Sequence, residues 1–343
     1  MKRESNIELL RIVAMFMILG LHANYYAIGV PGTHETSILP LQSFTRFLLE
    51  NICIVGVNVF VLISGWFGIN YKSKGLCNFL FQCLFFSIAI YVPFAIYNSV
   101  PTDRVNIMSA FLLYKNAYWF VWAYLVLYIF APVLNSFITS SGKNTVKRVL
   151  VLFFLIQTIC SFFTGTGFFQ TGYNPLSFFC LYLLARYFRL HRNNNGKHRY
   201  LGIYLLCTLS NTLIYFISDY SGHKNGSLLA IITSYTNPLN IVGALSLLLF
   251  FTKFKLQSKC INWLASSCFS VYLLHMHFCI SSHYAEYARE IFENFSGITY
   301  FVIILTYISS VFFASVIIDK GRIAVFNHIW NKYEKHKCRN DHP

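Results

Sequence analysis

Charged side chains are scarce in this sequence, and acidic ones are the scarcest. Only 11% of the 343 residues are charged, with 12 Asp and Glu against 27 Lys and Arg. A soluble domain carries about a quarter charged residues, so this chain cannot cover a water-exposed surface of its size. The classes of soluble enzyme and soluble binding domain are therefore excluded.

Signature motifs of several enzyme classes are also missing. The sequence has no HExxH zinc motif, no Gly-rich phosphate loop and no nucleophile elbow, which mark metalloproteases, nucleotide-binding proteins and α/β hydrolases. Its ten cysteines form no CxxC pair, and most lie inside apolar stretches. We interpret them as small packing residues and expect neither a disulfide framework nor a metal site.

The sequence is rich instead in apolar segments. Hydrophobic residues make up 56% of the chain, and a membrane-spanning helix needs about 20 of them in a row. Ten segments are near or above this length: residues 9–28, 48–69, 76–98, 118–138, 148–165, 174–190, 200–218, 228–251, 261–281 and 299–318. The pattern predicts an all-α integral membrane protein, a bundle of ten transmembrane helices.

Basic residues are distributed unevenly over the loops. A net charge of +15 would suit a nucleic-acid partner, but the basic residues lie in short loops rather than in one patch. With the N-terminus in the cytoplasm, inner segments hold 21 Lys and Arg and outer segments hold five. This is the positive-inside bias, and some of these charges could also attract anionic lipids or a phosphorylated cofactor. We predict a multi-pass cell-membrane protein with both termini cytoplasmic and no nucleic-acid partner.

The first apolar segment carries three ionisable residues, which are costly in a membrane and mark candidate sites. Glu8 and Arg11 lie three positions apart near its cytoplasmic end. Arg11 and His22 are eleven apart, which returns a helix to within roughly 20° of one face and raises it by about 16 Å. One face of this helix, the stripe from Arg11 to His22, thus carries a guanidinium near its cytoplasmic end and an imidazole near its opposite end. Arg11 could instead snorkel to the interface, and His22 could be a structural histidine.

This span suits coenzyme A, whose phosphates and thioester lie at opposite ends of an extended arm. An arginine fork pairs with phosphate oxygens, and a histidine is the natural base for a sugar hydroxyl near neutral pH. We therefore expect acetyl-CoA or another acyl-CoA as the donor substrate. Arg11, with Glu8 beside it, would bind the donor phosphates, and His22 would be the catalytic base.

Four stretches resemble one family of membrane enzymes, the acyltransferase-3 family. Its mark is an Arg, ten residues and a His, and NIELLRIVAMFMILGLH (6–22) fits it. Later family segments are similar to FVLISGWFGINYKSK (60–74), YWFVWAYLVLYIFAPVLN (118–135) and SVYLLHMH (270–277). The resemblance implies ten core helices, a cytoplasmic acyl-CoA donor and an outer glycan acceptor. Some members carry an acidic residue three positions after the His, where this chain has Tyr25, and some continue into a soluble domain, whereas we expect a stand-alone version.

Two positions extend the donor and acceptor ends of this scheme. Helical rise puts His275 at the depth of His22, and it matches the family's terminal His, so we expect a catalytic role at the acceptor end; a satisfied core histidine is the alternative. Lys72 and Lys74 follow the second segment on the inner side. They would bind the donor phosphates or only fix the topology.

Three further residues are weaker candidates. Asn58 and Ser64 are polar positions in the second segment that could line a cavity, with Ser64 toward the donor and Asn58 toward the acceptor. Trp119 stands at the outer end of the fourth segment, where it would stack on a sugar ring or belong to an interfacial aromatic belt.

Together these features predict a membrane acyltransferase that moves an acyl group, expected to be acetyl, from cytoplasmic acyl-CoA to a hydroxyl of an extracytoplasmic glycan. The acceptor would be a surface polysaccharide or a lipid-linked glycan, and the bilayer is the other partner. Residues 1–320 would form the transmembrane domain and 321–343 a basic cytoplasmic tail. A transporter or flippase, which often has inverted repeats and broken helices, and a polysaccharide polymerase are the alternatives; the sequence reveals no broken helix.

The charge bias predicts that the C-terminus faces the cytoplasm. A C-terminal fusion to a reporter that works only in the cytoplasm should therefore be active. Activity of an exported-type reporter at the same position, with the cytoplasmic type silent, would contradict the ten-helix topology.

Overall fold

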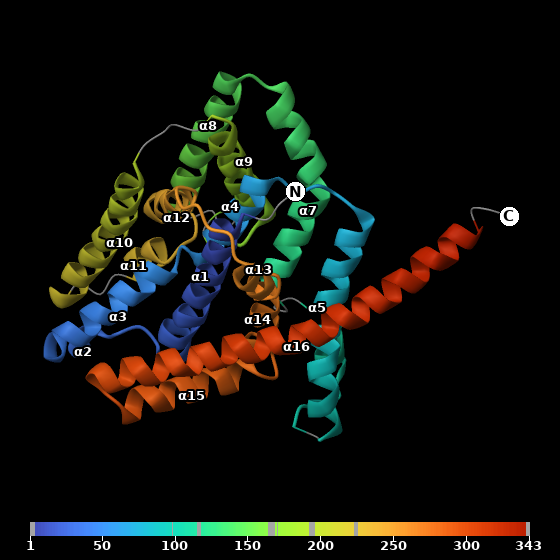
Figure 1. The fold of residues 1–343 in the computed structure, drawn as a ribbon. Helices are drawn as coiled ribbons and strands as arrows, with labels where there is room; N and C mark the ends of the chain where they lie inside the picture. The colour runs from blue at the N-terminus through green and yellow to red at the C-terminus, as the bar shows by residue number, and fades with distance from the viewer. Residues whose placement is uncertain are drawn as a thin grey trace.

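The computed structural model of this chain describes residues 4–97, 99–114, 118–163, 169, 171–191, 196–222 and 226–340. Every element of regular secondary structure in these ranges is helical (Figure 1), which confirms the all-α fold. The elements are α1 (Ser5–Leu21), the π-helix η1 (His22–Tyr26), α2 (Thr33–Ile38), α3 (Pro40–Cys53), α4 (Gly56–Phe67), α5 (Ser73–Ile96), α6 (Arg104–Ala110), α7 (Trp119–Ser140), α8 (Lys143–Phe162), α9 (Pro175–Leu190), α10 (Lys197–Tyr220), α11 (Gly226–Ile232), α12 (Pro238–Phe251), α13 (Lys259–Ala265), α14 (Cys268–His275), α15 (Ser281–Asn294) and α16 (Gly297–Asn340).

Seven of the ten predicted spans appear, within the described residues, as helices long and apolar enough to cross a membrane. They are Ser5–Tyr26, Pro40–Phe67, Ser73–Ile96, Trp119–Ser140, Lys143–Phe162, Lys197–Tyr220 and Gly297–His336. The predicted span 174–190 appears as α9, which has only 16 residues. The count of ten and the orientation of the termini therefore stay predictions.

The remaining two predicted spans are interrupted, so the expectation of unbroken helices is wrong there. Residues 228–251 are divided between α11 and α12, because Pro238 cannot donate to a preceding turn and the Asn237 side chain caps α12 instead. Residues 261–281 are divided between α13 and α14, where the Ser270 hydroxyl donates to the Ser267 carbonyl at 2.6 Å. Such local hydrogen bonds compete with the helical ladder.

Contacts at the two ends of the bundle show which helix termini share a side. At one end, Arg189 Nη2 of α9 lies 2.7 Å from Glu4 Oε1 beside the start of α1, and the Ser258 N–H before α13 donates to Ser5 Oγ at 3.0 Å. At the other, the Thr36 hydroxyl of α2 donates to Asp219 of α10, and this end, with α2 and α15, lies toward the bottom of Figure 1. These pairings agree with the predicted alternation.

Some residues used in the orientation count lie outside the described residues. These basic residues are Lys2, Arg3, Lys115, Arg192 and Lys224. The predicted boundary after residue 320 falls inside α16, which runs without interruption from Gly297 to Asn340.

Helix α4 packs closely against both α1 and α9 near the centre of the bundle. A Cβ added at Gly56 would lie 3.0 Å from the Ala14 carbonyl oxygen of α1. One added at Gly65 would collide with the Tyr182 carbonyl oxygen of α9 and lie 2.9 Å from its Cα. Small residues at these two positions allow the backbones to approach, as is common between helices in membranes. They fix α4 beside the helix that carries Arg11 and His22.

The close approach at Gly65 predicts a loss of stability on Gly65→Ala. Overpacking against a backbone that cannot shift costs about 1–3 kcal/mol, so the Tm in detergent should fall. Gly243→Ala in α12 is the matched control, because a Cβ there would meet its nearest atom at 3.6 Å. Equal Tm values for the two variants would contradict the packing described here.

Candidate active site

Two histidines from opposite ends of the sequence meet at the C-terminal end of α1. His22 is the first residue of η1 and His275 the last of α14, and His22 Nδ1 lies 2.9 Å from His275 Nε2. The sequence places both at one depth, and the structure brings the two rings into direct contact. Their catalytic roles stay predictions.

The hydrogen bonds of His275 decide which nitrogen of His22 carries a proton. His275 Nδ1 lies 2.6 Å from the carbonyl oxygen of Val271. A carbonyl only accepts, so His275 Nδ1–H donates, and the neutral ring then accepts at Nε2. His22 Nδ1–H must therefore donate to His275, which leaves His22 Nε2 unprotonated. The network assigns these proton positions, and an unprotonated Nε2 is what a general base needs.

A small apolar cavity lies against His22, along the predicted stripe of α1. Met15, Ile18 and His22 line it from this helix, at the spacing that puts them on the face of Arg11. Phe60 of α4 and Phe269 of α14 line it from neighbouring helices. Its volume is about 30 Å³, about the share of one water molecule in the liquid. The site is thus apolar and nearly closed beside the imidazole.

Aromatic rings form part of the wall of this cavity and lie next to it. Trp119 and Tyr235 both line it, and Trp119 stacks on Tyr173 with ring centroids 4.2 Å apart. Burial raises the pKa of the Tyr173 hydroxyl, which keeps that group neutral. The Asn58 amide donates to the Tyr235 carbonyl at 3.0 Å. Two predicted acceptor-end residues, Trp119 and Asn58, therefore lie at or behind the wall of the His22 cavity.

The N-terminal end of the stripe holds an ion pair. Arg11 Nε lies 3.5 Å from Glu8 Oε2, and 30% of the Arg11 side chain is exposed. Glu8 therefore neutralises Arg11 in this structure.

Ser64, one turn from Phe60 on α4, has its hydroxyl 3.1 Å from that of Tyr124.

Comparison with known families matches residues 4–320 to a family described as an acyltransferase domain. The chain belongs to the acyltransferase-3 family. As a member, it is a membrane acyltransferase and requires an acyl donor. No curated protein and no solved structure matches the chain.

The neighbouring histidine of this acyltransferase-3 member has a different environment. His277 Nε2 lies 3.0 Å from the Ser87 carbonyl of α5, and its Nδ1 accepts from the Cys279 N–H at 3.1 Å. Both ring nitrogens are thus used in packing hydrogen bonds. The structure pairs His275, and not His277, with His22.

Within the described part of the chain, the contacts of the two predicted lysines of the acyltransferase do not involve Arg11. Lys72 is exposed at the start of α5, and its carbonyl accepts from the Tyr128 hydroxyl at 3.2 Å. Lys74 Nζ lies 5.6 Å from the ring centre of Trp330 on α16. Lys74 lines a separate pocket whose walls include neither Arg11 nor Ser64.

Polar residues that the sequence analysis did not select hold η1 in place. The Asn24 amide donates to Glu50 Oε2 at 2.9 Å and to the Arg46 carbonyl at 3.0 Å. The Arg289 guanidinium donates to the Ala27 carbonyl at 2.9 and 3.0 Å. Glu50 brings a buried carboxylate to η1, the segment in which the sequence resemblance implies an acidic residue after the His in some members. Its signal in the sequence is an acidic residue inside a predicted span.

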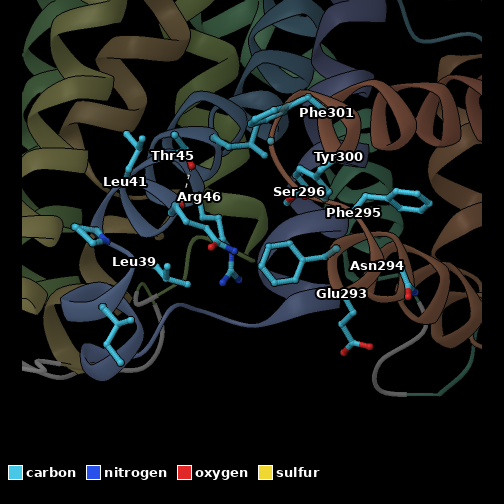
Figure 2. A pocket seen from close by; sticks show the side chains of 16 residues that line it. Leu39, Leu41, Thr45, Arg46, Glu293, Asn294, Phe295, Ser296, Tyr300 and Phe301 are labelled. Atoms are coloured by element: carbon cyan, nitrogen blue, oxygen red, sulfur yellow. Dashed lines mark hydrogen bonds between the residues drawn. The ribbon is translucent and has the colours of Figure 1, made fainter.

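A cavity of about 650 Å³, much larger than the one beside His22, lies elsewhere in the acyltransferase, between α2–α3 and α15–α16. Figure 2 shows Arg46 within it, while Glu293 and Asn294 turn their polar ends away from this arginine. Arg46 already donates to Glu35 and Asn24. Neither His22 nor His275 lines this cavity, so it is not the candidate active site.

His275, which ends α14, and His277, which lies in the turn after it, allow a matched test. His275→Ala removes the acceptor of His22 Nδ1–H, so acyl transfer per folded protein should fall about tenfold or more. His277→Ala should lower Tm, because it removes two packing hydrogen bonds, yet keep transfer per folded protein within a few-fold. Equal losses of transfer in both variants would contradict the pairing.

Proposed function

We propose that this membrane acyltransferase moves an acyl group, expected to be acetyl, from cytoplasmic acyl-CoA to a hydroxyl of an extracytoplasmic glycan. One observation carries the proposal. His22, oriented by His275, lines an apolar cavity on the same helix stripe as Arg11. A surface polysaccharide or a lipid-linked glycan is the proposed acceptor.

The donor would lie along α1, with its phosphates at Arg11. Arg11 is partly exposed and paired with Glu8, so a phosphate would compete with the carboxylate for the guanidinium. Lys72, exposed at the start of α5, would add a positive charge. The pantetheine arm would follow Met15 and Ile18, and the rings of Phe60 and Phe269 would have to turn aside, because the cavity is far smaller than the arm.

The reaction would take place at His22 Nε2. This nitrogen would accept the proton of an acceptor hydroxyl while the oxygen attacks the thioester carbonyl. The C–S bond then breaks, and the proton returns from His22 to the sulfur of the departing coenzyme A. A transient acyl group on His22 is the alternative chemistry. The apolar lining excludes water, which protects the thioester from hydrolysis, and the small volume favours a short acyl group such as acetyl.

The acceptor would approach from the outer, aromatic end. Trp119, Tyr173 and Tyr235 form a cluster there. Their rings offer apolar surface and two phenol hydroxyls, which suit a sugar with apolar faces and hydroxyl edges. Trp119 is the proposed acceptor contact nearest the cavity, and Asn58 supports it through Tyr235.

A transporter is the alternative that one structural feature favours. The interrupted pairs α11–α12 and α13–α14 are the kind of broken helix found in transporters. Membership of an acyltransferase family supports the enzyme instead. The break between α13 and α14 also serves that enzyme, because α14 ends at His275.

Two variants at the ends of the stripe test the proposal. His22→Ala should lower glycan acylation about 10²–10⁴-fold per folded protein, the usual contribution of a general base, while acyl-CoA affinity is kept. Arg11→Ala should lower acyl-CoA affinity, and Arg11→Lys should restore it only in part, because an ammonium lacks the planar fork.

Acylation is measured by mass spectrometry of the glycan and affinity on the same purified sample. Transfer by His22→Ala within a few-fold of wild type would exclude His22 as the base. Unchanged affinity in Arg11→Ala would leave Arg11 as an interface anchor.

A further inference from the structure

A polar pocket lies where α5 and α13 begin, at the end of the bundle that also holds the start of α1. Its volume is about 630 Å³, and α5, α13 and α16 enclose it. Its polar lining residues are Lys74, Asn78, Gln82, Lys259, Asn262, Ser266, Arg322 and Asn327. The proposed acyl transfer uses none of these residues, although Lys74 is expected from the sequence to lie at the donor phosphates.

The pocket is positively charged. Lys74, Lys259 and Arg322 line it, and no carboxylate is among its lining residues. Asp319 lies behind Arg322, with its Oδ1 2.9 Å from both Nε and Nη2 of the guanidinium. This buried pair leaves the charges of the two exposed lysines uncompensated, since no described carboxylate lies within ion-pair distance of either.

The guanidinium of Arg322 is fixed by hydrogen bonds and keeps N–H groups that these bonds do not use. Its Nη1 also donates to Asn78 Oδ1 at 2.7 Å, and its side chain is only 2% exposed. These contacts use one N–H on each guanidinium nitrogen, so Nη1 and Nη2 each keep a second one. A fixed guanidinium with two unused N–H groups, flanked by two ammonium groups, is suited to a phosphate.

The surroundings of the pocket match a lipid better than a free nucleotide. Trp263 lines it, and Trp330 lies beside Lys74; indoles concentrate at the membrane interface. On α16 the apolar side chains of Ile317, Ile318 and Val325 are exposed. A headgroup phosphate in the pocket would therefore have an apolar helix surface beside it for the acyl chains.

We propose that this pocket binds the phosphate of an anionic phospholipid at the inner interface. Basic pockets between transmembrane helices on the cytoplasmic side recognise such headgroups. The proposal is separate from acyl transfer and holds whether or not His22 is the base. Coenzyme A carries phosphates too, so the test has to separate the two sources.

Phosphatidylglycerol binding to purified protein in phosphatidylcholine nanodiscs, followed by native mass spectrometry, tests the site. The pocket variant is Lys259→Gln, and the matched control is Lys255→Gln; both lysines are exposed and each variant loses one charge. Each basic residue contributes roughly fivefold near an anionic headgroup. Phosphatidylglycerol affinity should fall about fivefold in the pocket variant and less than twofold in the control.

Coenzyme A affinity of the same samples, in nanodiscs of phosphatidylcholine alone, identifies the phosphate source. A change of less than twofold in the pocket variant, beside lost phosphatidylglycerol binding, supports the lipid site. A parallel fall in coenzyme A affinity would assign the pocket to the donor and overturn the lipid proposal. Equal phosphatidylglycerol affinity in the pocket and control variants would overturn it as well.

Discussion

The hydrogen bond between His22 and His275 is the interaction on which the rest of the site depends. It joins residues 253 positions apart in the sequence and requires that the C-terminal ends of α1 and α14 lie close to each other. The Val271 carbonyl fixes the ring of His275, and His275 in turn leaves one nitrogen of His22 unprotonated. Without this chain of contacts, His22 would be one more polar group in an apolar bundle.

The bundle supports that bond from several sides. Close packing at Gly56 and Gly65 holds α4 against α1 and α9, which forms one wall of the cavity beside His22. The polar contacts of Asn24, Glu50 and Arg289 hold the π-helix that begins at His22. Buried polar groups of this kind are costly unless they are paired, so their pairing makes one geometry of η1 much more favourable than others.

Helical geometry made part of the site predictable from the sequence. The period of 3.6 residues puts Arg11 and His22 on one face, and the rise per residue puts His275 at the depth of His22. Both inferences need only one helix at a time. The partner of Lys74 was not predictable, because it depends on where α16 crosses α5. The same holds for Glu50, which reaches η1 through the packing of α3.

The fold shows the same division between local and tertiary information. Apolar length identified seven spans that the structure also has as long helices. It did not reveal the breaks at 233–237 and 266–267, although the residues there, TSYTN and SS, are polar. Asn237 before Pro238 is a local cap signal for the start of a new helix. The break at 266–267 produces the short helix α14, which ends at His275.

The cavity beside His22 is small in this structure, about 30 Å³, and Arg11 is not among its lining residues. A bound donor would therefore have to displace the phenylalanine rings and separate Arg11 from Glu8. An electron cryo-microscopy structure with a non-hydrolysable acyl-CoA analogue tests this central claim most directly. The account predicts the phosphates at Arg11 and the thioester-like carbonyl within about 3.5 Å of His22 Nε2. A donor bound with its acyl end away from His22, for example in the cavity beside Arg46, would contradict it.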